Sequence, residues 1–69
     1  MIFSTVLEVC GQSILYNVYK NNTVAFLSPK QQYKVAPILF AVQQGQQWVI
    51  KGTSDYSVIE QAYREISDL

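Results

Sequence analysis

Side chains able to perform acid-base or nucleophilic chemistry are scarce in this chain of 69 residues. There is no histidine, so neither a Ser-His-Asp nor a Cys-His arrangement can be assembled. The five acidic residues are scattered: Glu8 lies in an apolar segment, and Asp55, Glu60, Glu65 and Asp68 lie near the end of the chain. Caps and a solvated helix face explain these carboxylates better than a catalytic pair. We therefore expect no catalytic residue and no enzymatic activity.

The sequence also offers few residues that could bind a metal or a cofactor. Cys10 is the only cysteine, so it has no intramolecular disulfide partner, and without histidine the usual zinc-ligand sets cannot form. No Lys or Arg lies near Cys10 in the sequence, which predicts a small buried hydrophobic residue rather than a reactive thiol. Gly11, Gly45 and Gly52 are too far apart for a phosphate-binding loop. We expect no metal and no cofactor.

Charge is low and balanced, which bears on the class of partner. Five basic residues match five acidic ones, and charged residues make up only 14% of the chain. Such a chain offers little neutralisation of phosphates, which argues against nucleic acid as the main partner. The basic residues are also dispersed along the chain, at Lys20, Lys30, Lys34, Lys51 and Arg64.

The ends and apolar runs of the sequence predict a protein of the cytoplasm. The first ten residues carry no basic residue and are interrupted by Ser4, Thr5 and Glu8, unlike a signal peptide. The longest nearly apolar run, residues 35–42, is broken by Pro37 and is far shorter than a membrane span requires. We expect no membrane segment, and a lone thiol suits a reducing compartment.

Five segments rich in β-branched and aromatic residues predict strands. Asn21 with Asn22, and Gln44 with Gly45, mark two hairpin turns, because both pairs tolerate the positive φ that tight turns require. The segments are residues 2–10, 14–20, 23–27, 38–43 and 46–51. With two-residue loops, the facing pairs are Lys20 with Thr23, Val18 with Ala25, Tyr16 with Leu27, Phe40 with Val49, Ala41 with Trp48 and Leu39 with Ile50.

A helix is expected at the end of the chain. Thr53, Ser54 and Asp55 offer side-chain oxygens to the first free N–H groups, and Glu60 and Arg64 form an i,i+4 pair. The expected apolar stripe is Tyr56, Ile59, Ala62, Tyr63, Ile66 and Leu69. The expected solvent face is Glu60, Gln61, Arg64, Glu65 and Asp68.

Together these elements predict one α+β domain over residues 1–69. It comprises a small antiparallel sheet of four to five strands, built on two hairpins, with the amphipathic C-terminal helix packed on it. Both hairpins carry large apolar groups on both faces, whereas one helix covers only one face of a sheet. Closure of the strands into a small barrel is the alternative way to hide the second face.

An uncovered apolar face predicts recognition as the function. We expect a non-catalytic protein-interaction module that forms a homodimer or binds a protein partner through its apolar sheet face. The residues expected to carry the interaction are Tyr19, Phe26, Phe40 and Trp48. The alternatives are a single-stranded nucleic-acid binder that stacks bases on the aromatic face, and a barrel that holds a small apolar ligand.

Overall fold

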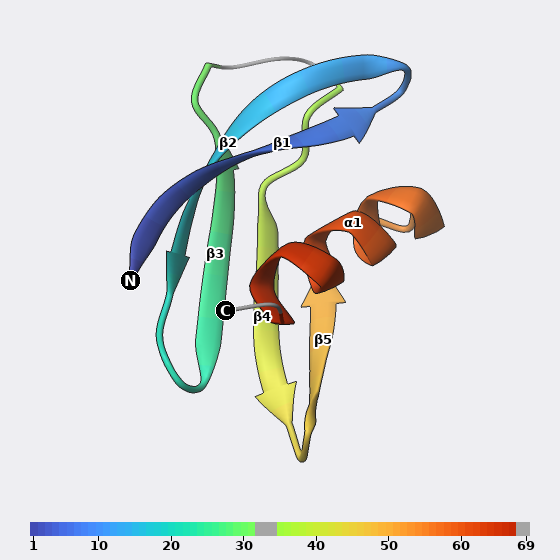
Figure 1. Ribbon diagram of the computed structural model, residues 1–69. Coiled ribbons are helices and arrows are strands. Elements are labelled where there is room, and N and C mark those ends of the chain that lie inside the picture. Colours follow the sequence, from blue (N-terminus) through green and yellow to red (C-terminus); the bar gives the residue numbers. More distant parts are fainter. Residues whose placement is uncertain (32–34, 68–69) are drawn as a thin grey trace.

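The described part of the chain folds into one antiparallel sheet and one helix (Figure 1). The computed structural model describes residues 1–31 and 35–67. Its elements are β1 (Ile2–Val9), β2 (Gln12–Lys20), β3 (Val24–Pro29), β4 (Leu39–Gln44), β5 (Gln47–Lys51) and α1 (Tyr56–Ser67). The strands pair in chain order with β1 and β5 at the edges, so the sheet is open and not a closed barrel. This confirms the predicted α+β architecture.

The turn between β1 and β2 explains an error in the sequence prediction. Val9 pairs with Gln12, so Cys10 and Gly11 form the two-residue loop, with φ of 51° and 76°. Positive φ at both loop positions is the requirement of a type I′ turn, which matches the twist of the flanking strands. A loop residue at a hairpin tip faces solvent. Cys10 is accordingly exposed, and the prediction that it is buried is wrong.

The turn between β2 and β3 lies one residue later than predicted. Lys20 pairs with Ala25 instead of Thr23. The reason lies in Asn21, whose Oδ1 accepts hydrogen bonds from the backbone N–H groups of Thr23 and Val24, both at 2.9 Å. The Asn21 N–H in turn donates a 3.0 Å hydrogen bond to the Val24 carbonyl oxygen, so Asn21 closes the turn with both its side chain and its backbone. The shift is two residues, so every side chain keeps its predicted face.

The same two-residue shift occurs between β4 and β5. Gln44 pairs with Gln47, which leaves Gly45 and Gln46 in the loop, and Phe40 faces Lys51 rather than Val49. Gly45 has φ of 63° and stands at the first loop position, where a type II′ turn needs positive φ. Glycine meets that requirement most easily, and it therefore fixes the loop one residue later than predicted.

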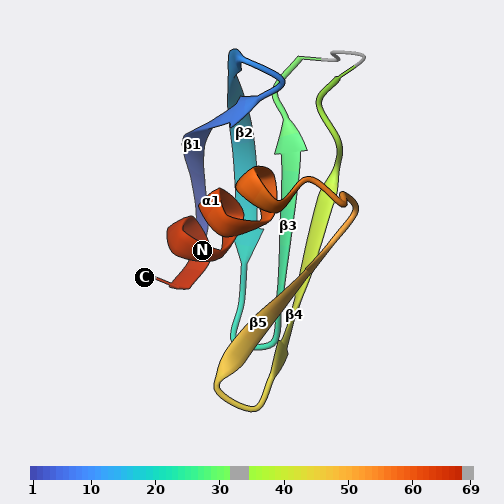
Figure 2. The same cartoon turned by 90° about the vertical axis from the view of Figure 1, so that its right-hand side faces the viewer.

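One face of the sheet forms the core and is covered by α1 (Figure 2). Tyr16 is the largest fully buried side chain. Asp55 begins the helix as predicted, because its Oδ1 accepts a hydrogen bond of 3.0 Å from the N–H of Ser57. The buried residues are Leu7, Val9, Ile14, Tyr16, Val18, Ala25, Leu27, Leu39, Ala41, Val58, Ala62 and Ile66.

The helix packs through a stripe that agrees with the predicted one at Ala62 and Ile66 and differs from it elsewhere. Its buried residues are Val58, Ala62 and Ile66, while Tyr56 and Tyr63 are exposed. Small side chains at positions 58 and 62 let the helix approach the sheet closely, and tyrosine rings do not fit there. Gln61 and Glu65, predicted to face solvent, bond to β1 instead. The exposed ion pair of Glu60 and Arg64 is present at 3.9 Å.

Three residues used in the sequence predictions, Lys34, Asp68 and Leu69, lie outside the described residues. Within the described residues, no helix has the length and apolar character needed to cross a membrane.

Candidate interaction surface on the open sheet face

The side of the sheet that faces away from α1 presents a continuous row of large side chains. Strand pairing places Ile2 opposite Tyr19, Tyr19 opposite Phe26, and Phe26 opposite Phe40. Phe40 in turn faces Lys51, so one row runs across all five strands. Tyr19 and Phe26 are 49% and 48% exposed, and Ile2 is 78% exposed. Three of the four predicted interaction residues thus lie side by side on this surface.

We call this surface the open face and define it by strand alternation. Next to the aromatic row lies an apolar row of Val24, Val42 and Val49. On the other side of the aromatic row lies a polar row of Ser4, Asn17 and Ser28, followed by the apolar pair of Val6 and Leu15. The open face comprises Ile2, Ser4, Val6, Glu8, Ser13, Leu15, Asn17, Tyr19, Val24, Phe26, Ser28, Phe40, Val42, Gln44, Gln47, Val49 and Lys51.

The centre of the open face is ordered by an aromatic pair. The rings of Phe26 and Phe40 meet edge to face, with centroids 5.4 Å apart and planes at 76°. This arrangement brings a ring edge against a ring face and contributes about 0.5–1.5 kcal/mol beyond area burial. Since each ring limits the movement of the other, a partner meets a surface that is already organised.

Trp48, the fourth predicted interaction residue, lies on the opposite side of the sheet. It pairs with Gln43 and packs partly buried against the core beneath α1. Its ring is covered by the ammonium group of Lys20, with Nζ 5.4 Å from the ring centroid. Lys20 Nζ also donates a hydrogen bond of 2.5 Å to the Ile66 carbonyl oxygen near the end of α1. Trp48 therefore belongs to a contact that holds the helix on the sheet.

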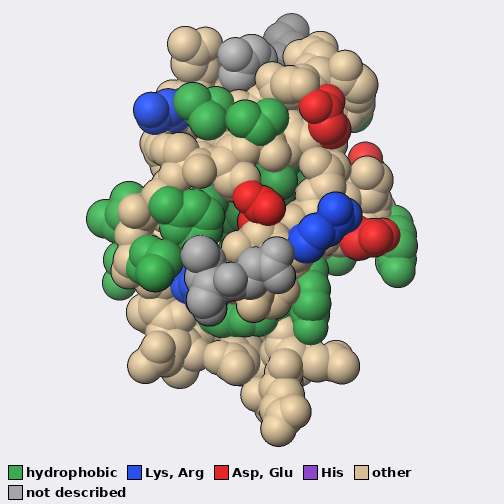
Figure 3. Space-filling model, in the orientation of Figure 1, with side chains coloured by type: hydrophobic (Ala, Val, Ile, Leu, Met, Phe, Trp, Pro, Cys, Tyr) green, Lys and Arg blue, Asp and Glu red, His purple; other side chains and the backbone are tan. Residues whose placement is uncertain are grey.

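Charge on the open face is confined to its margins. Among the described residues of this face, Glu8 on β1 and Lys51 on β5 carry the only charged side chains. Figure 3 views the molecule with α1 toward the reader, and on that side both signs of charge are also few and mixed. The aromatic and valine rows therefore carry no field that would repel a second copy of the same surface.

Several residues of the open face were not singled out in the sequence analysis. Ile2, Val6 and Leu15 are all exposed, and Ile2 is the most exposed of them. Because side chains alternate along a strand, they lie on the face of the sheet that is turned away from the core residues Leu7 and Ile14. This alternation was the feature of the sequence that could have identified them. It was weak because both parities of these strands are apolar.

Among the described residues, the polar group in the most buried surroundings is the Tyr16 hydroxyl, which has a structural role. Tyr16 is fully buried, its hydroxyl donates a 2.6 Å hydrogen bond to the Pro37 carbonyl oxygen, and burial raises the pKa of this phenol. This environment keeps the phenol neutral and structural. Within residues 1–31 and 35–67, no three Cys, Asp or Glu side chains gather closely enough to hold a metal ion.

No protein-family model, curated protein or solved structure matches this chain.

Proposed function

We propose that this chain is a non-catalytic protein-interaction module whose copies associate through the open face. The observation that carries the proposal is the row of Ile2, Tyr19, Phe26 and Phe40 across four neighbouring strands, in which the first three side chains are exposed and Phe40 is half-buried. Contiguous apolar patches of this kind are rare on monomeric proteins and mark sites of association.

The size of the protein supports the same proposal. A 69-residue chain buries a modest core, and small domains commonly gain stability from disulfides, metals or association. The only cysteine, Cys10, is exposed and unpaired. Burial of the open face against another subunit would supply apolar contact area that the single helix does not.

A second copy is the partner that the surface chemistry favours. Two sheets pack face to face when their inner surfaces are apolar and uncharged, with side chains interdigitating across a layer about 10 Å thick. The aromatic and valine rows meet this requirement, and Glu8 and Lys51 lie at opposite edges of the sheet, where water still reaches them. A symmetric pair thus buries the apolar rows without burying charge.

Single-stranded nucleic acid is the second candidate, since three aromatic rings on adjacent strands suit base stacking. The open face, however, has little positive charge to neutralise phosphate groups. Lys51 is the one basic side chain among the described residues of the open face, and Lys20 is engaged beneath the helix. Oligonucleotide affinity that falls steeply with salt would favour this candidate over protein association.

Light scattering on three chains tests the proposal. The wild-type chain should show at least the mass of a dimer at high concentration, and Phe26→Ser should weaken association at least tenfold because it removes an aromatic ring from the centre of the interface. The control is Tyr56→Ser, which removes a ring that is 76% exposed on α1. Wild-type protein that stays monomeric, or equal weakening by both substitutions, would contradict the proposal.

A further inference from the structure

The outer edge of β1 presents backbone groups that are free to pair with another strand. Met1 and Lys20 exchange backbone hydrogen bonds, each 2.8 Å long. In an antiparallel ladder such pairs alternate with pairs whose N–H and C=O groups point outward. Ile2, Ser4 and Val6 therefore direct these groups away from β2. Within the described residues, no strand lies beyond β1.

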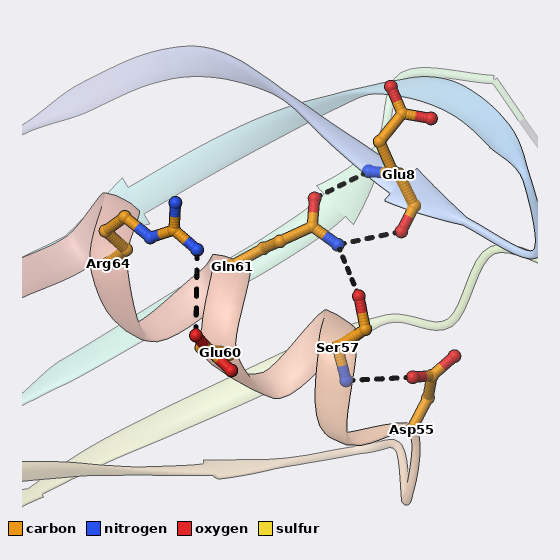
Figure 4. A network of polar contacts seen from close by, with 6 residues as sticks. All are labelled: Glu8, Asp55, Ser57, Glu60, Gln61 and Arg64. Atoms are coloured by element: carbon orange, nitrogen blue, oxygen red, sulfur yellow. Dashed lines mark hydrogen bonds and ion pairs between the residues drawn. The ribbon is translucent and has the colours of Figure 1, made fainter.

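At the next outward-pointing residue, Glu8, the backbone N–H and C=O groups already have a hydrogen-bond partner. The side-chain amide of Gln61 accepts a 2.8 Å hydrogen bond from the Glu8 N–H and donates one of 2.9 Å to the Glu8 carbonyl oxygen (Figure 4). One amide that makes both bonds imitates a neighbouring strand at that position. It closes the edge at Glu8 and leaves residues 2–6 as the open portion.

The open portion lacks the devices that usually prevent strand addition. Edge strands are commonly protected by lysine, proline or inward-pointing charge. Residues 2–6 contain none of these, and the side chains of Ile2 and Val6 are 78% and 53% exposed. This segment of the edge is apolar, uncharged and accessible.

We propose that residues 2–6 pair antiparallel with the same segment of a second copy, centred on Ser4. In this register Ile2 faces Val6 of the second copy, and Ser4 faces its own equivalent. Each outward N–H then meets an outward C=O, because the segment is complementary to itself under a two-fold rotation. The proposal shares with the proposed function only the identity of the partner, since the contact is a strand edge and not the open face.

The helix side of this edge is hollowed. A hollow of about 160 Å³ lies between β1 and α1, lined by Val6, Leu7, Gln61, Arg64 and Glu65. In the proposed register the side chains of the partner segment at positions 3 and 5 lie on the helix side of the joined sheet, where Phe3 packs on the core and Thr5 bonds to Glu65 of its own copy. On the other side, Ile2 and Val6 of the two copies come together. The two open faces then form one wider apolar surface on the same side of the joined sheet.

Amide hydrogen exchange, followed residue by residue by NMR at low and high protein concentration, tests the edge directly. In dilute protein the amides of Thr5 and Leu7 should be protected by β2, while those of Ser4 and Val6 exchange freely. At high concentration the Ser4 and Val6 amides should slow at least tenfold. Light scattering on the same samples supplies the mass.

Two variants distinguish strand pairing at the β1 edge from association through the open face. Ser4→Pro removes an outward N–H and leaves the ladder to β2 intact, because proline is tolerated at such edge positions. It should abolish the slowing at Val6. Phe26→Ser disturbs the open face and should leave the slowing at Ser4 and Val6 in place.

The possible outcomes point to different conclusions. If the mass doubles while Ser4 and Val6 keep exchanging freely, the edge pairing is wrong and the proposed function stands. If Ser4 and Val6 slow and Phe26→Ser leaves the mass unchanged from wild type, the edge pairing is supported and the open face is not the interface. Protein that stays monomeric at every concentration overturns both.

Discussion

Phe26 and Phe40 occupy directly opposed positions on β3 and β4, and their rings meet edge to face at 5.4 Å on the open face. Both side chains point away from the core, which is filled by their strand neighbours Leu27 and Leu39. The pair therefore organises the exposed surface, whereas the core is complete without it. This separation allows the interaction surface to be altered without dismantling the fold.

Lys20 is expected to stabilise the packing of α1 on the sheet. Lys20→Met removes the ammonium that bonds to the Ile66 carbonyl oxygen and lies over Trp48, but keeps most of the aliphatic stem. The free energy of unfolding should fall by about 1–2 kcal/mol, which is typical for the loss of a charged hydrogen bond and a cation–π contact. Urea unfolding followed by Trp48 fluorescence measures the change.

The control for this prediction is Lys30→Met, at an exposed position. It should leave the free energy of unfolding within about 0.5 kcal/mol of wild type. If Lys20→Met is no more destabilising than the control, the ammonium contact does not stabilise the helix.

Gly52 is expected to tolerate no side chain. Its φ is 111°, and a Cβ built there would lie 2.4 Å from the Ile38 carbonyl oxygen. Gly52→Ala combines an unfavourable backbone conformation with a clash against backbone, so it should cost more than about 2 kcal/mol. Gly11→Ala is the matched control, because φ is also positive there but no heavy atom lies within 4 Å. Its expected cost is about 1 kcal/mol. Equal losses in thermal unfolding would show that the close approach to Ile38 is unimportant.

Tyr16 is expected to make stability fall in alkaline solution. Burial raises its folded-state pKa above the ordinary value of 10.0. Its contribution is therefore fully present below pH 10 and is lost as the pH rises through the folded-state pKa. Tyr16→Phe deletes the bond to the Pro37 carbonyl oxygen and should cost about 1–2 kcal/mol at pH 7. The difference between wild type and variant, measured by urea unfolding, should shrink above pH 10; a constant difference would refute this role of the phenol.

Much of the fold follows from local patterns in the sequence. Alternating β-branched and aromatic residues identified the strands, and the oxygen-rich residues before Tyr56 identified the helix start. Face assignment survived the two register errors because each shift was two residues, which preserves side-chain parity. The shifts themselves depended on the Asn21 side chain and on the backbone angles of Gly45, which composition does not reveal.

The candidate site was predictable in part. Tyr19, Phe26 and Phe40 share the open face as their spacing indicates, whereas Trp48 lies beneath the helix. The predicted pairing of Ala41 with Trp48 already put Trp48 on the face opposite to Phe40. The sequence did not show which of the two faces α1 covers, because both parities of the strands are apolar. The role of Gln61 was missed for a similar reason, since a glutamine on a helix gives no sign that its amide will bond to a strand edge.

Thermal unfolding over a wide range of protein concentration tests the central claim, association through the open face, most directly. Association that accompanies folding makes the melting temperature rise with concentration. The wild-type chain should show this rise, and Phe26→Ser should lose most of it while Tyr56→Ser keeps it. A wild-type melting temperature that is independent of concentration would contradict the claim.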